Sequence, residues 1–65
     1  MSNYNIYVIR IAKDYGYCVD IIELRRRARS YKEAGARARQ ICNKILRRYE
    51  GEAMKVSIIS IFEEG

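Results

Sequence analysis

The sequence contains no histidine, and Cys18 and Cys42 are its only cysteines. A closed structural zinc site needs four ligands, usually Cys or His, so we expect no metal site. Without histidine the chain also lacks the Cys–His and Ser–His pairs that activate a nucleophile. Its acids Asp14, Asp20 and Glu23 do not form an evident pair for acid–base catalysis. We therefore expect a protein that is not an enzyme, with no catalytic residue and no cofactor.

Proline is also absent, and the 65 residues contain no internal repeat, low-complexity segment or linker. This pattern is typical of one small domain over residues 1–65. Apolar runs stay far below the roughly 20 residues that cross a bilayer, and the N-terminus lacks the basic and apolar regions of a signal peptide. We expect a cytoplasmic protein with no membrane partner.

The two cysteines leave two interpretations open. A bridge between Cys18 and Cys42 would close a loop of moderate length and would contribute on the order of 3 kcal/mol. Alternatively, each thiol packs as a small apolar side chain. We favour the second interpretation because each cysteine lies within an apolar pattern.

Three segments rich in β-branched and aromatic residues predict strands, over residues 4–12, 17–27 and 54–62. Between the last two, Ser30 to Glu33 has the S-x-x-E pattern of a capping box, which predicts a helix that begins at Tyr31 and ends near Gly51. A helical crossover returns the third strand beside the first. The expected fold is α+β with the order β-β-α-β: a three-stranded antiparallel sheet of order 2-1-3, with one helix packed on one face.

The predicted helix has one apolar side, made of Ala34, Ala38, Ile41, Cys42, Ile45, Leu46 and Tyr49. We interpret Gly35 as a close-packing point on this side, at a cost of about 1 kcal/mol relative to alanine. Arg47 and Arg48 fall in the last turn, where cations favour the negative end of the helix dipole. We expect the tail, residues 63–65, to fray.

A three-residue hairpin loop fits the first two strands. A type I turn through Asp14 and Tyr15, followed by Gly16 in the left-handed conformation, would place Lys13 opposite Tyr17. This register sets charge against charge and Ile against Ile, whereas a shift by one residue would not. The predicted pairs are Arg10 with Asp20, Ile9 with Ile21, Val8 with Ile22, and Ile6 with Leu24.

Apolar residues lie on both sides of all three strands. In this register one side holds Tyr7, Ile9, Ile11, Val19 and Ile21, and the other holds Ile6, Val8, Ala12, Cys18, Ile22 and Leu24. In the third strand, Val56, Ile58 and Phe62 face oppositely to Ile59 and Ile61. One helix covers one side only, and the sequence does not decide which. Because a monomer would leave the other side in water, we expect a homo-oligomer, most simply a dimer with two sheets face to face.

Positive charge is concentrated between Arg25 and Arg48. Ten of the thirteen basic residues lie there with Glu33 as the only acid, a net charge of about +9, while the flanks together carry about −4. Such a field attracts polyanions. We predict DNA or RNA as the partner, held by its backbone phosphates with little sequence preference. The predicted binding residues are Arg25, Arg26, Arg27, Arg29, Arg37, Lys44 and Arg48, with Tyr15 as a platform for bases.

An alternative function stays open. The arginines after Leu24 could form a solvated strand end paired with acids such as Glu23, Glu50 or Glu52. In that case the second apolar sheet face would define the function. The chain would be a homo-oligomeric protein-interaction or assembly module without nucleic-acid binding.

Overall fold

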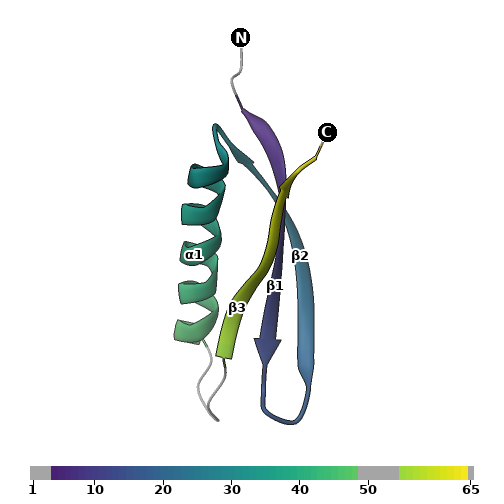
Figure 1. Ribbon diagram of the computed structural model, residues 1–65. Coiled ribbons are helices and arrows are strands. Elements are labelled where there is room, and N and C mark those ends of the chain that lie inside the picture. The colour runs from purple at the N-terminus through teal and green to yellow at the C-terminus, as the bar shows by residue number, and fades with distance from the viewer. Residues whose placement is uncertain (1–3, 49–54, 65) are drawn as a thin grey trace.

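The computed structural model describes residues 4–48 and 55–64. Its elements are β1 (Asn5–Asp14), β2 (Val19–Ala28), α1 (Tyr31–Arg48) and β3 (Lys55–Glu63). The three strands are antiparallel neighbours in the order β2-β1-β3, and α1 lies against one side of the sheet (Figure 1). The predicted fold class, strand order and helix start are confirmed. Predicted strand ends differ from the observed ones by one or two residues, and Tyr49, Gly51 and Met54 lie outside the described residues.

The hairpin between β1 and β2 differs from the predicted one. Asp14 pairs with Val19, so four residues rather than three form the loop, and the predicted pairing of Arg10 with Asp20 is wrong. Gly16 does adopt a positive φ of 93°. Its N–H donates to Asp14 Oδ1 at 2.8 Å, and the Tyr15 N–H donates to the Cys18 carbonyl at 2.9 Å. These two bonds define the longer turn.

The longer loop shifts the β1–β2 register by three residues, which turns every β2 side chain to the other side of the sheet. Ile9 pairs with Leu24 and Ile11 pairs with Ile22. The predicted register would have placed Glu23 beside Tyr7 under the helix, where a carboxylate has no water. The observed pairs are Arg10 with Glu23, Ala12 with Ile21, Val8 with Arg25, and Ile6 with Arg27.

The β1–β3 register contains a bulge. Arg10 pairs with Ser60 and Ile11 pairs with Ile58, so Ile59 is an extra residue in β3. The extra residue corrects the predicted division of this strand, because Val56, Ile58 and Ile61 all pack against the same core. Phe62 pairs with Val8 on the opposite side.

These registers define two sides of the sheet. The helix face carries Tyr7, Ile9 and Ile11 of β1, Ile22, Leu24, Arg26 and Ala28 of β2, and Val56, Ile58 and Ile61 of β3. The open face carries Ile6, Val8, Arg10 and Ala12 of β1, Val19, Ile21, Glu23, Arg25 and Arg27 of β2, and Ser60 and Phe62 of β3. The question that the sequence left open is thus answered: the helix covers the face of Ile9.

The core lies between α1 and the helix face. Ile9 and Ile11 are fully buried against Ala38 and Cys42, and a second cluster joins Tyr7, Ala28 and Ala34. Small side chains on α1 let the helix approach the sheet closely. Leu46, predicted in the apolar side of the helix, is instead exposed.

The start of α1 follows the capping pattern. The Glu33 N–H donates to Ser30 Oγ at 3.2 Å, as predicted. The Glu33 carboxylate reaches back one residue further than expected and accepts the Arg29 N–H at 3.3 Å. The first bond satisfies a backbone donor that the first helical turn cannot satisfy itself, and the second ties the residue before the cap to that turn.

Both cysteines are free, so the absence of a disulfide is confirmed, but only Cys42 is buried. The expectation that Cys18 packs as an apolar side chain is wrong, because Cys18 is exposed in the hairpin loop. Burial raises the pKa of the Cys42 thiol, although a backbone hydrogen bond opposes this shift. The protonated thiol therefore packs as a small apolar side chain in the core.

Two further expectations need correction. An added Cβ at Gly35 would meet no atom within 4 Å, so Gly35 is not a close-packing point. The tail is not frayed at Glu64, whose N–H donates to the Ile6 carbonyl at 2.8 Å. Gly65 lies outside the described residues.

No described helix has the length and apolar character needed to cross a bilayer.

Candidate nucleic-acid interface

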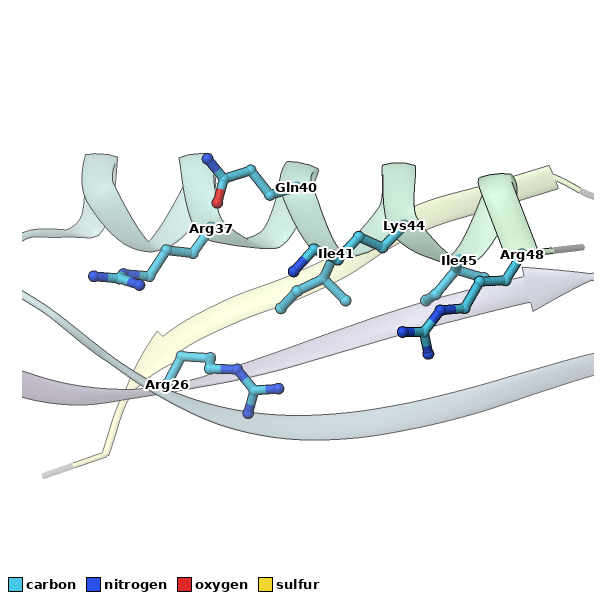
Figure 2. Close-up of a pocket in the computed structure, with 7 residues that line it drawn as sticks. All are labelled: Arg26, Arg37, Gln40, Ile41, Lys44, Ile45 and Arg48. Atoms are coloured by element: carbon cyan, nitrogen blue, oxygen red, sulfur yellow. The ribbon is translucent and has the colours of Figure 1, made fainter.

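A groove runs between α1 and β2 on the helix face. It exists because α1 packs more closely over β3 than over β2, which leaves the β2 margin of the face partly uncovered. Its volume is about 310 Å³. Figure 2 shows the lining side chains, which are Arg26, Arg37, Gln40, Ile41, Lys44, Ile45 and Arg48.

The helical wall of the groove follows from sequence spacing. Starting from Arg37, the wall residues of α1 recur at intervals of three, four, seven, eight and eleven positions, which is one side of an α-helix. Ile41 and Ile45 pack at the edge of the core and form the apolar floor. Lys44 and Arg48 extend from the helix above this floor (Figure 2).

Arg26 supplies the opposite wall. It lies on the helix face because it shares the alternation of Leu24 and Ala28. Its guanidinium Nη1 donates to the Arg25 carbonyl at 2.8 Å, and the side chain runs along β2, across the groove from α1 (Figure 2). Two separate elements therefore bring cations to one groove.

The groove is strongly cationic. Its lining holds four basic side chains, one amide and two isoleucines, and no carboxylate. Arg37 forms an ion pair with Glu33, with 3.2 Å between Nη2 and Oε1, one turn earlier on α1. Among the described residues, Arg26, Lys44 and Arg48 have no carboxylate partner. Within residues 4–48 and 55–64, three cations without a carboxylate partner thus lie beside an apolar floor, an arrangement that attracts extended anions in general.

The other predicted binding residues lie elsewhere. Arg25 is on the open face, where its Nε is 3.2 Å from Glu64 Oε2. Arg27 is on the same face, opposite Ile6. The Arg29 guanidinium lies 5.1 Å from the centre of the Tyr4 ring. The arginine run after Leu24 is thus divided between the two faces of the sheet and does not form one binding surface.

Tyr15 is not a lining residue of the groove either. It lies in the hairpin loop, where its ring stacks on Tyr17 with centroids 6.2 Å apart. Tyr17 is the more exposed of the two rings.

Sequence reasoning missed Gln40, Ile41 and Ile45 as groove residues. The signal was present, because Gln40 lies three residues after Arg37 and four before Lys44 on the same side of the helix. Ile41 and Ile45 were assigned to the core alone, whereas they also form the groove floor.

Comparisons with known proteins name no relative: no protein-family model matches the chain, and neither the curated proteins nor the solved structures give a significant match. Within residues 4–48 and 55–64, no group of three His, Cys, Asp or Glu side chains could hold a metal ion. The geometry of the groove is therefore the basis for the proposal below.

Proposed function

We propose that this protein binds DNA or RNA along the groove between α1 and β2, with Arg26, Arg37, Lys44 and Arg48 contacting backbone phosphates. The supporting observation is that four cations from two elements line one groove, in which the described residues contribute no carboxylate. Guanidinium forks match phosphate oxygens in geometry, and Lys44 adds a compact charge.

The length of the groove suits a nucleic-acid backbone. Arg37 and Arg48 are eleven residues apart on α1, which corresponds to roughly 16 Å along the helix axis. One strand of a duplex carries a charge about every 3.4 Å along its axis. The groove therefore spans roughly five phosphates of one strand.

The floor of the groove favours low sequence preference. Ile41 and Ile45 offer no hydrogen bond to a base edge, and Gln40 is the one lining side chain with both a donor and an acceptor. Contacts to phosphate position a nucleic acid without reading its sequence. Duplexes of different sequence should bind with similar affinity.

A charge-reversal pair tests the groove directly. In one variant, Arg26→Glu and Lys44→Glu reverse two groove cations. In the matched control, Lys32→Glu and Arg47→Glu reverse two exposed helix cations that do not line the groove. Both variants have the same net charge. Duplex affinity at about 0.1 M salt is measured for each by fluorescence anisotropy.

We expect the groove variant to lose about a hundredfold in affinity and the control less than about tenfold, because only the first loses direct phosphate contacts. The wild-type affinity should fall with salt at a log–log slope of roughly −3 to −4, as four phosphate contacts require. Equal losses in the two variants, or binding that ignores salt, would refute the proposal.

The open face supports a second candidate function, in which the chain is a homo-oligomeric assembly module. The observation behind it is a row of exposed apolar side chains, Ile6, Val19, Ile21, Ile59 and Phe62. Self-association with no affinity for DNA or RNA in low salt would favour this candidate over the first. We propose a dimer in either case.

A further inference from the structure

The apolar part of the open face is large for a chain of this size. Ile21 is 63% exposed and Val19 55%. Ile59, which follows Ile58 of the helix face along β3 and so is turned to the open face, is 50% exposed. Val19 and Ile21 lie at the start of β2, next to the hairpin, and Ile59 lies at the bulge of β3. Monomeric proteins rarely leave a contiguous apolar surface of this kind in water.

The charges of the open face are largely paired within it. Arg10 Nε lies 2.9 Å from Glu23 Oε1, and the Arg10 guanidinium also covers the Phe62 ring, 5.5 Å from its centre. Arg25 is paired with Glu64 across the sheet. Cations and acids on this face nearly balance, whereas the groove side carries unpaired cations.

This distribution of charge favours a second copy of the chain over a strongly charged partner at the open face. A strongly acidic or basic partner would gain little there, because the ion pairs already neutralise each other. A second copy of the chain brings the same apolar residues and the same balanced charges. Two copies can therefore approach through their open faces without like-charge repulsion, and their cationic grooves stay far apart.

The area is adequate for such a pair. A three-stranded sheet with ten-residue strands measures roughly 33 Å by 14 Å. Two opposed faces then cover about 900 Å² as flat planes, and the relief of the side chains raises this figure. Specific interfaces begin near about 1,000 Å² of total buried surface.

We propose that two copies pack open face to open face, so that their grooves point outward on opposite sides and the dimer holds two nucleic-acid segments at once. The bridging part rests on the proposed function of the groove. The sheets would lie about 10 Å apart, as in a β-sandwich. Each segment would follow one groove, with the paired sheets between them.

A double variant, Ile21→Thr with Ile59→Thr, tests the pairing. Threonine keeps the β-branched shape and the net charge, so the strands should still form. The matched control is Leu46→Gln, which removes an exposed apolar side chain from α1 without changing charge or the open face. Circular dichroism checks that all proteins are folded.

Sedimentation equilibrium gives the dimer dissociation constant. We expect the double variant to raise it by about a hundredfold or more, because four isoleucines leave the interface of each dimer, and the control to leave it unchanged. Bridging is measured with a bead-bound duplex that retains a second, labelled duplex. The double variant should bind one duplex normally but fail to retain the second.

Different failures have different meanings. A wild-type protein that binds duplex but stays monomeric at about 100 μM would overturn the pairing and leave the proposed function intact. A dimer that binds no duplex would overturn bridging together with the proposed function. Bridging that survives in the double variant at wild-type strength would show that the open face is not the interface.

Discussion

The two faces of the sheet are built from the same three strands, yet they behave differently. Ile11 on the helix face is fully buried, while Ile21 on the open face is 63% exposed. Ile11 belongs to the central strand β1, and Ile21 lies near the hairpin end of the outer strand β2. The comparison teaches that burial here depends both on the cover that the helix provides and on the place of a strand in the sheet, because Val8 of the central strand is only 3% exposed even on the open face.

The largest expected effect comes from truncating these two isoleucines. Ile11→Ala should lower the free energy of unfolding by about 2–5 kcal/mol, because it leaves a cavity under α1. Ile21→Ala should cost less than about 1 kcal/mol in dilute solution, where its side chain is already in water. Urea denaturation followed by circular dichroism measures both. Equal costs in dilute solution would contradict the comparison.

Protein concentration sharpens this first test. If the open faces pair, the midpoint of unfolding should rise with concentration in the wild type, because only the folded chain dimerises. In Ile21→Ala this rise should be smaller. The cost of Ile11→Ala, by contrast, should persist at every concentration.

Ser60 offers the next test, on the side of Arg10. Its Oγ is buried and, within the described part of the chain, has no hydrogen-bond partner. Ser60→Ala removes an unsatisfied hydroxyl and should raise the free energy of unfolding by about 1 kcal/mol. Thermal denaturation checks this, with the exposed Ser57→Ala as the control, which should change stability by less than about 0.5 kcal/mol. A loss of stability in Ser60→Ala would mean that the hydroxyl has a partner in solution.

The two described glycines give a further pair of tests. Gly35 tests whether the surface of α1 has open space, and Gly16 tests the backbone conformation of the hairpin loop. Gly35→Ala should stabilise the fold by about 0.5–1 kcal/mol, because the new methyl group meets open space and alanine favours the helix. Gly16→Ala should destabilise it by about 1 kcal/mol, because φ is +93° there. Chemical denaturation gives both values. A destabilising Gly35→Ala would indicate that something packs on this part of α1.

The smallest effect is expected for the exposed ion pair of the open face. A double-mutant cycle with Arg10→Ala and Glu23→Ala should give a coupling energy of about 0.2–1 kcal/mol that declines with salt, because water screens both groups. Replacing Phe62 by Leu separates the contact of Arg10 with the ring from the ion pair. A coupling well above this range would mean that the open face is already covered in solution.

Most of the fold could be predicted because its signals are local. The capping pattern from Ser30 to Glu33 fixes the helix start, and β-branched runs mark the strands. Gly16 was expected at positive φ, and it is found there. Strand order followed from the connection between β2 and β3 through α1.

The register could not be predicted because it depends on distant contacts. Either loop length pairs oppositely charged residues with Arg10, so local charge pairing did not distinguish them. The observed choice puts Ile22 and Leu24 under a helix that comes later in the chain. The bulge at Ile59 was hidden for a similar reason, because Ile58, Ile59 and Ile61 have the same character.

The candidate site was predicted on the helix but not on β2. Helical spacing alone places Arg37, Lys44 and Arg48 together, whatever the register. The side taken by Arg26 depends on the β1–β2 register, and a shift by one or three residues would have sent Arg25 and Arg27 to the groove in its place. The number of charges along the sequence locates a basic segment. The alternation of side chains along β2 decides which of its arginines lie on the same face and can bind one ligand.

The bulge in β3 also bears on how the protein avoids uncontrolled aggregation. β3 is an outer strand, and a regular outer strand presents a row of amide and carbonyl groups that can template the addition of another chain. The extra residue Ile59 interrupts that row and increases the local twist. Removing it would leave Val56, Ile58 and Ile61 in strict alternation. The outer edge of β3 would then be regular, and open-ended fibrils could grow from it.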